Sequence, residues 1–243
     1  MDRLLVPSMS YKEMYDILMD DFPKVRYWAE KQLDKVKKEL MMASIFPAFK
    51  IIKYKSPLSN NRYYIYFYVG NASLLNDPYV GHFAELFIKK KRFLVAAHMG
   101  GYKPLMKDEI IDMPQVYVYS HHFFEQYNKR FLKEESLTIN EIACHFFSRN
   151  KLYEPVRIDE RVNRNIDNYD ENADRGFKVK DGFCFTVYDI DIEEKDSNPQ
   201  ALLFLFTTYM NVDGLKEDQI NAILEESQKS WDLVFSPYRK KTL

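Results

Sequence analysis

The chain has 243 residues, with 35 basic and 36 acidic side chains and a formal net charge of −1. This balance excludes a strongly basic nucleic-acid coat and a polyanionic tail, although charged patches can still form locally. A hydrophobic fraction of 46% and an aromatic fraction of 16% provide enough apolar surface to fold most of the chain. The two cysteines, Cys144 and Cys184, lie far apart and in no metal-binding spacing, which excludes a disulfide scaffold and a cysteine-rich metal module.

The amino terminus and the apolar runs predict an intracellular protein. Residues 1–7 lack the basic segment and the long apolar stretch of a secretory signal. The most apolar run, 201–206, is much shorter than the roughly 20 residues that cross a bilayer as a helix. We therefore expect a cytoplasmic protein that has no membrane partner.

The first 44 residues carry a helical pattern. Ser10 and Glu13 have the spacing of a capping box, in which both side chains bond to free amides at a helix start. Apolar residues then recur at helical spacing as far as Leu40, with an interruption at Pro23. The pattern predicts two consecutive helices or one kinked helix.

After Pro47 the period of the hydrophobic pattern changes from 3.6 to 2, which indicates strands. Residues 62–69 alternate between two faces that are both rich in aromatic or apolar side chains. Further strands are expected at 84–88, 93–98 and 116–119. The short segments between these strands favour antiparallel pairing.

The second half of the chain returns to helices and then to strands. Ser120 is placed to cap a helix over 121–132, and Thr138 with Glu141 forms a capping box for the next helix. The polar segment 159–175 is expected to be a solvated excursion. Two strands at 183–190 and 201–210 and a closing helix from Asp213 complete the predicted elements.

These elements predict an α+β fold, with an antiparallel β-sheet packed against N-terminal, central and C-terminal helices. Strands occur in runs and do not alternate with helices, which argues against a parallel α/β fold. We expect a single domain over residues 1–243, with a helical part at 1–44 and the sheet and remaining helices at 45–243.

Histidines cluster in the helix predicted over 121–132. His122 and Arg130 fall on one stripe of that helix, and His121 falls on the neighbouring stripe. A histidine that titrates near neutral pH can act as general acid or base, while an arginine holds a phosphate, so the pattern fits a phosphodiester site. The alternative is a helix surface with ordinary ion pairs four residues apart, above a buried aromatic stripe.

Zinc is a competing interpretation of His121, His122, Cys144 and His145, because imidazole and thiolate are zinc ligands. The spacing argues against it, since adjacent histidines point about 100° apart on a helix and rarely share one metal. Familiar phosphate-cradling glycine loops are also absent from the sequence. We therefore expect neither a metal site nor a cofactor.

A basic patch is predicted beside an aromatic strand. The run Lys89, Lys90, Lys91 and Arg92 lies in an interval without acidic residues. With one face of the strand at 62–69, it suggests a charged groove and stacking surface for single-stranded nucleic acid. The aromatic members of this candidate site are Tyr64, Tyr66 and Tyr68. The alternative is a hairpin turn whose lysines protect a sheet edge, beside tyrosines half-buried under another element.

A hydroxyl group is available in the last predicted strand. Alternation places Thr207 on the face of Tyr209, and Thr208 on the face of Phe206. Either hydroxyl could complete a phosphate site, although threonine is common in strands for its β propensity alone.

The segment SHHFFEQYNKRF, the capped helix after it, and the strand FLFTTYM leading to GLKEDQ resemble poorly characterised phage and bacterial-island proteins. Some of those proteins are grouped with the barnase, EndoU, colicin and RelE superfamily of metal-independent ribonucleases. The resemblance covers the regions 121–149 and 203–219. It implies helices packed on an antiparallel sheet and cleavage of RNA through attack of the 2′-hydroxyl. The residues it would assign are His121 or His122, Arg130, and Thr207 or Thr208.

Two functions are therefore considered. The first is metal-independent RNA cleavage, with His122 as acid or base, Arg130 as phosphate clamp, and Thr207 or Thr208 in support. The second is a non-catalytic protein-binding or assembly domain, whose excess of Tyr and Phe covers an interface. The first requires the histidine, arginine and hydroxyl groups to converge in a cleft, whereas the second requires an exposed apolar patch.

Overall fold

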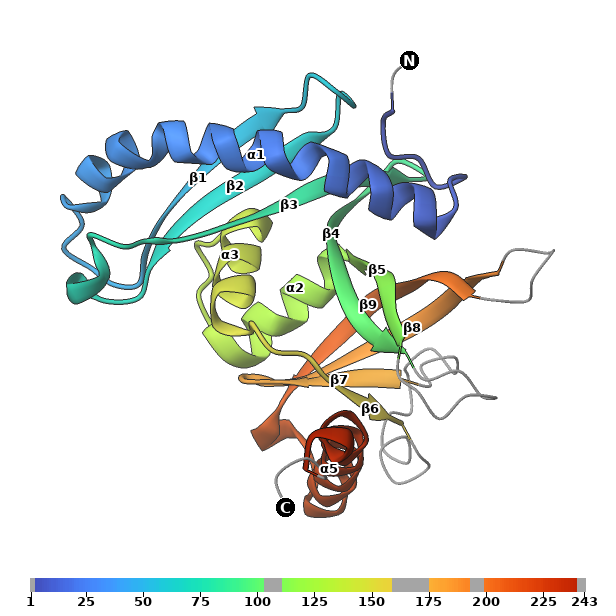
Figure 1. Ribbon diagram of the computed structural model, residues 1–243. Helices are drawn as coiled ribbons and strands as arrows, with labels where there is room; N and C mark the ends of the chain where they lie inside the picture. Colours follow the sequence, from blue (N-terminus) through green and yellow to red (C-terminus); the bar gives the residue numbers. More distant parts are fainter. Residues whose placement is uncertain (1–2, 103–110, 159–174, 193–198, 240–243) are drawn as a thin grey trace.

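The computed structural model describes residues 3–102, 111–158, 175–192 and 199–239. Nine strands form one sheet in the order β1-β2-β3-β4-β5-β9-β8-β7-β6 (Figure 1). The strands are β1 (Ala48–Lys55), β2 (Arg62–Val69), β3 (Tyr79–Ile88), β4 (Lys91–Tyr102), β5 (Ile111–Tyr119), β6 (Glu154–Arg157), β7 (Arg175–Val179), β8 (Gly182–Ile192) and β9 (Pro199–Asn211).

The fold is α+β, as the sequence predicts, and the sheet is mixed. Seven of the eight neighbouring strand pairs are antiparallel. The eighth pair, β5 with β9, is parallel, because the chain between these two strands is long enough to return in the same direction. The excursion expected at 159–175 lies outside the described residues except for Arg175, which begins β7.

The helices are α1 (Tyr11–Leu40), α2 (His121–Tyr127), α3 (Ile139–Arg149) and α5 (Glu217–Arg239), with short turns η1 (Ala72–Leu74), η2 (Asn128–Leu132) and η3 (Val212–Gly214). The predicted capping box at Ser10 and Glu13 is present, and α1 continues through Pro23 as one helix. The capping box at Thr138 and Glu141 likewise begins α3. None of the helices in the described ranges has the length and apolarity that a bilayer span requires.

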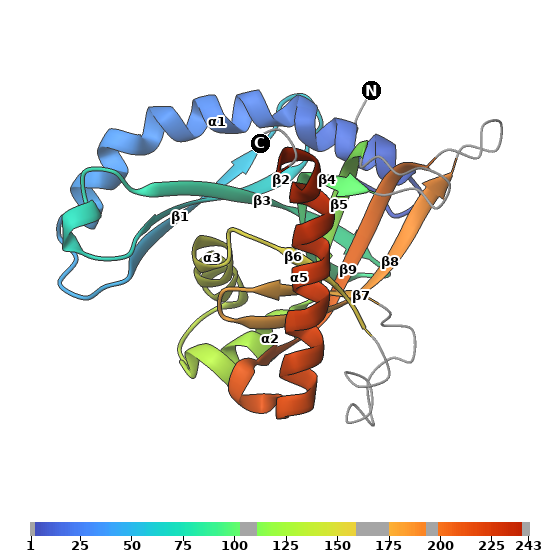
Figure 2. The same ribbon diagram turned by 60° about the horizontal axis from the view of Figure 1, so that its bottom comes forward.

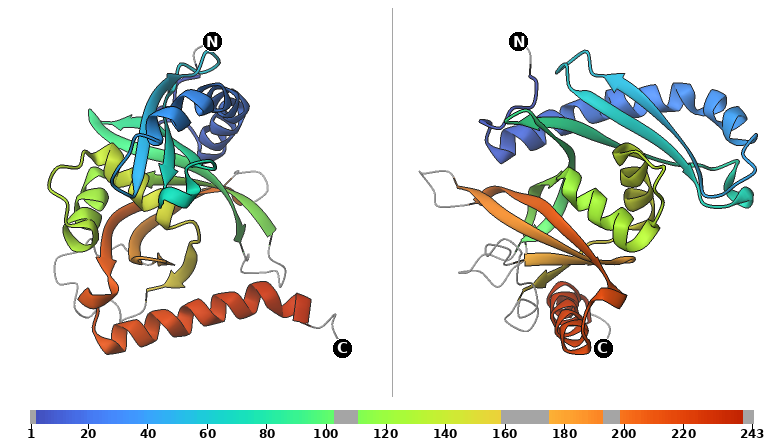
Figure 3. Two further views of the ribbon diagram at one scale, coloured as in Figure 1. Left: turned by 90° about the vertical axis from the view of Figure 1, so that its left-hand side faces the viewer. Right: turned by 180° about the vertical axis from the view of Figure 1, so that it is seen from behind.

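The sheet bends around α2 and α3, which lie on its inner side (Figures 1 and 3). Helix α1 covers the opposite face of β1–β5 (Figure 2), and α5 runs beside β6, away from α1 (Figure 3). Strand β2 therefore buries both faces, which explains the two apolar faces read from 62–69. Tyr63, Ile65 and Phe67 pack beneath α1, while Tyr64 and Tyr66 pack on the side of α2 and α3.

A fully buried carboxylate ties α1 to the β1–β2 turn. Asp21 is 0% exposed and accepts hydrogen bonds from the hydroxyls of Ser56, Ser59 and Tyr63. The side-chain amide of Asn61 also donates to it, at 3.3 Å. Four neutral donors thus take the place of water around one buried carboxylate. A polar group can be buried in a core when its hydrogen bonds are satisfied in this way.

Replacing Asp21 by alanine should therefore destabilise the fold strongly. The variant leaves several buried donors without an acceptor, so we expect a loss of at least about 3 kcal/mol in the free energy of unfolding. The matched control is Asp20→Ala, because Asp20 is exposed and pairs with Arg3 at the surface, and its loss should cost less than about 1 kcal/mol. Urea unfolding of both variants measures the difference, and equal losses would contradict the anchoring role.

Candidate functional site

The two histidines of α2 lie in different surroundings. His122 is exposed, and its Nδ1 lies 3.8 Å from a carboxylate oxygen of Glu125. His121 is half-buried, and burial together with the nearby Arg92 guanidinium lowers its pKa. The two imidazoles therefore do not form one acid–base pair.

Arg130 joins the end of α2 to the sheet. It lies in η2, the π-helical turn that follows α2, and its guanidinium donates a hydrogen bond to the backbone carbonyl of Tyr209 in β9. The side-chain amide of Asn211 donates in return to the carbonyl of Arg130, at 3.2 Å. This guanidinium holds two elements together, which differs from the phosphate clamp that the sequence suggested.

A β-bulge separates the two threonines in β9. The register of β8 and β9 shifts between Phe185 and Thr186, so that Thr207 is an extra residue and the alternation predicted for this strand is wrong. Phe206 and Tyr209 consequently share the core beside α2 and α3. Thr208 lies opposite Phe185, which packs beneath α5.

Neither threonine hydroxyl is free to act in a cleft. The Thr207 hydroxyl donates to the carbonyl of Phe185 at 3.2 Å. The Thr208 side chain is 1% exposed, and its hydroxyl has no hydrogen-bond partner within the described part of the chain. The Ser120 hydroxyl, which caps α2, lies 3.4 Å from the carbonyl oxygen of Thr207, so the start of α2 is beside this threonine. His122 is nevertheless at the surface, and the Arg130 guanidinium is bonded to the carbonyl of Tyr209.

The two hydroxyls should respond in opposite ways to substitution by valine. Thr208→Val removes a buried hydroxyl without a partner, so we expect unchanged or higher stability, by up to about 1 kcal/mol. Thr207→Val removes a hydrogen bond and should cost about 1 kcal/mol. Urea unfolding measures both, and a clear loss of stability in Thr208→Val would show that its hydroxyl is satisfied in the folded protein.

The predicted tyrosine surface is not exposed. Tyr64 and Tyr66 are only 7% and 2% exposed, and Tyr68 is half-buried with its ring against His145. Because α3 covers these rings, a nucleic-acid base cannot stack on Tyr64 or Tyr66. These tyrosines therefore lie under another element, α3, as the alternative interpretation of the sequence predicts.

Arg92 links the predicted basic patch to α2 and α3. Its Nε lies 2.6 Å from Glu85, its Nη2 donates to the Asn140 side chain at 2.6 Å, and its guanidinium lies 4.8 Å from the centre of the Tyr64 ring. The same guanidinium contributes to the lowered pKa of His121. The two regions singled out in the sequence, the histidines and the basic run, therefore meet at Arg92.

Exposed cations from two hairpins gather at the same end of the sheet. In the β1–β2 hairpin, Lys55 pairs directly with Arg62, and Arg62 lies 4.0 Å from Glu85 of β3. The strand β1 was not predicted, so nothing in the sequence pattern placed Lys55 beside Arg62, the first residue of the strand predicted at 62–69. We use the term basic end for six exposed cations, namely Lys53, Lys55, Arg62, Lys89, Lys90 and Lys91.

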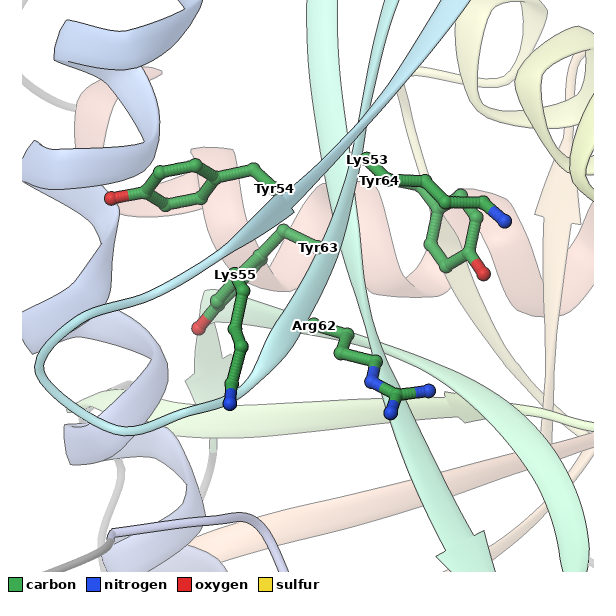
Figure 4. A pocket seen from close by; sticks show the side chains of 6 residues that line it. All are labelled: Lys53, Tyr54, Lys55, Arg62, Tyr63 and Tyr64. Atoms are coloured by element: carbon green, nitrogen blue, oxygen red, sulfur yellow. The ribbon is translucent and has the colours of Figure 1, made fainter.

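A hollow of about 310 Å³ lies at the β1–β2 part of the basic end. Figure 4 shows that its lining side chains leave both faces of the hairpin, with Tyr54 on one side and Lys53 on the other. Lys55 and Arg62 lie beyond them at the end of the hairpin. The arrangement offers cationic contacts and does not enclose a substrate.

The β3–β4 turn has an unusual backbone. Ile88 pairs with Lys91, which leaves Lys89 and Lys90 as a two-residue loop. Both have positive φ, 47° and 67°, as in a type I′ turn. Such turns favour Asn-Gly, because a side chain in the left-handed region clashes with its own backbone. The sequence thus places two lysines where neither is conformationally preferred.

Two histidines outside α2 are neutral in the folded protein. Burial lowers the pKa of both His82 and His98 to about 4, from 6.5. The ring of His98 stacks on Tyr117 with centroids 4.1 Å apart, and that of His82 lies beside Phe22. Both side chains are partly buried, and their lowered pKa keeps them uncharged at neutral pH.

Their burial predicts a loss of stability in acid. In the unfolded chain each imidazole protonates at its ordinary pKa. The contribution of the two histidines to the free energy of unfolding is therefore complete above pH 6.5 and is lost as the pH falls towards 4. By pH 5, each histidine should have lowered the free energy of unfolding by about 2 kcal/mol. We expect His82→Gln and His98→Gln each to reduce the slope of unfolding free energy between pH 7 and 5, and an unchanged slope would contradict the prediction.

In the residues that the structure describes, no group of three or more His, Cys, Asp or Glu side chains is placed to hold a metal ion. No protein-family model matches the chain, and neither a curated protein nor a solved structure is significantly similar to it. The site must therefore be judged from its own geometry and charge.

Proposed function

We propose that this protein binds nucleic acid, with RNA as the first ligand to test, and that it contacts the phosphate backbone through the basic end. The observation that carries the proposal is the pair Lys89 and Lys90 in the left-handed region. Each residue costs about 1–2 kcal/mol there relative to glycine. Strained backbone of this kind is retained where the side chains serve a function.

The distribution of charge supports the same ligand. The chain is nearly neutral, yet six exposed cations lie together on two hairpins. Phosphate groups attract such a cluster and release condensed counterions when they bind, so binding of this type depends steeply on salt. The alternative, that the lysines protect a sheet edge, applies only to the part of the hairpin beyond Ala84 and Leu94, since β3 and β4 are otherwise interior strands.

We propose binding without cleavage. General acid–base cleavage needs a histidine, a phosphate-binding cation and a hydroxyl within reach of one phosphate. His122 is exposed, Arg130 holds the carbonyl of Tyr209, and the Thr208 hydroxyl is buried beneath α5. Binding needs only the cations of the basic end.

The double variant Lys89→Asn/Lys90→Gly separates function from stability. It supplies the residues that the turn prefers, so we expect the free energy of unfolding to rise by about 1–2 kcal/mol. It also removes two cations, so affinity for an RNA oligonucleotide should fall and the slope of log K against log salt should decrease by roughly 1. Fluorescence anisotropy across a salt series measures the affinity and the slope.

The matched control is Lys24→Gln/Lys35→Gln, which removes the same charge from the exposed surface of α1. Equal weakening by both double variants would show non-specific attraction and would contradict a site at the basic end. If the wild-type protein binds no nucleic acid at low salt, the proposed function is wrong.

Incubation with RNA in EDTA tests the absence of cleavage. We expect the RNA to remain intact with the wild-type protein and with His122→Ala. Products with 2′,3′-cyclic ends that form with the wild-type protein and disappear with His122→Ala or Arg130→Ala would show a metal-independent ribonuclease instead. Circular dichroism of the variants confirms that each is folded.

A further inference from the structure

The β3–β4 hairpin carries an exposed aromatic ring among its cations. Phe87 is 49% exposed, whereas most phenylalanines of the described residues are buried. It belongs to none of the hydrophobic clusters, and no aromatic ring in the described ranges packs against it. Phe22, the other exposed phenylalanine, rests on His82.

The position of Phe87 on the hairpin is fixed. It pairs directly with Arg92 across β3 and β4, two residues before the Lys89–Lys90 turn. Arg92 is held in turn by Glu85, Asn140 and the Tyr64 ring, so the base of the hairpin is anchored to α3 and β2. The ring is therefore presented by a rigid element and not by a loop.

The hairpin also extends past its neighbours. The pairing of β2 with β3 stops at Ala84, and the pairing of β4 with β5 stops at Leu94. Phe87 and the turn lysines lie beyond both limits, where no adjacent strand covers them. A ligand can reach the ring together with the turn lysines, Lys89 and Lys90, whereas Lys91 pairs with Ile88 and therefore leaves the opposite face of the hairpin.

We infer that Phe87 is a base-stacking residue and that the ligand of the basic end is single-stranded. This inference rests on the proposed function. An exposed ring between cations matches the alternation of bases and phosphates in a single strand, whose base faces are free to stack. In a duplex those faces are already stacked, and only the phosphates remain for the lysines.

The test compares a single-stranded RNA with a duplex of the same sequence. Phe87→Ala should weaken binding of the single strand by about five- to 100-fold, which is the range for one lost stacking contact. Affinity for the duplex should change less than twofold. Phe22→Ala is the matched control, because it removes an exposed phenylalanine from α1, and its affinity for both ligands should equal that of the wild type.

Phe87→Trp provides a second readout. The indole can stack as phenylalanine does, so single-strand affinity should be retained, and base stacking should quench its fluorescence beyond any change in the parent protein. Quenching by single strands but not by duplex is the expected result. An ionic contact alone would leave the emission unchanged.

The possible failures are distinguishable. If the wild-type protein binds both ligands and Phe87→Ala binds both as well as the wild type, the stacking inference is overturned and the proposed function stands. If neither ligand binds while an acidic peptide does, the partner is a protein and both proposals are overturned.

Discussion

Enclosing two helices within a bent sheet is the constraint on which the rest of the structure depends. The space between α2, α3 and the sheet is filled by aromatic side chains, and the largest fully buried side chains of the described residues are all Tyr or Phe. Tyr119 of β5 stacks on Phe206 of β9 with centroids 4.3 Å apart, and Phe123 and Phe146 meet edge to face. The aromatic excess is thus a requirement of the core. It gives no support to an aromatic-rich interface as the function.

A core built from tyrosine must also satisfy buried hydroxyls. Tyr127 donates to the Asp181 carboxylate at 2.7 Å, and Tyr209 donates to the Asp181 carbonyl. Arg149 holds the same carboxylate through two bonds of 2.8 Å. Burial opposes ionisation of Asp181, but the bonds from Arg149 and Tyr127 outweigh it and lower its pKa. Tyr127 of α2 and Arg149 of α3 therefore hold these helices to Asp181, which lies between β7 and β8.

Local signals could be read from the sequence and long-range pairing could not. The capping boxes that begin α1 and α3 depend on residues three apart, so both helix starts were predictable. The bulge in β9 depends on the register with β8, and without it Thr208 was assigned to the wrong face. The edge strand β1 was missed because its lysines interrupt the apolar pattern, and Lys53, Lys55 and Arg62 were missed with it. The basic run at 89–92 was visible, but the burial of Tyr64 and Tyr66 is decided by α3.

The stable base of the β3–β4 hairpin allows the tip of this hairpin to adopt a strained backbone. Two lysines with positive φ and a half-exposed phenylalanine each disfavour the folded state at this turn. The turn still forms, because β3 and β4 are paired from Ala84 to Ile88 and Glu85 and Asn140 fix Arg92 at the base of the turn. An Asn-Gly turn and a polar residue at position 87 would fold more readily on the same scaffold. The three unfavourable residues of this hairpin, Phe87, Lys89 and Lys90, all lie in the part that extends beyond the neighbouring strands. A structural role would favour the residues that fold best there, so the strain is better explained by a ligand that the tip contacts.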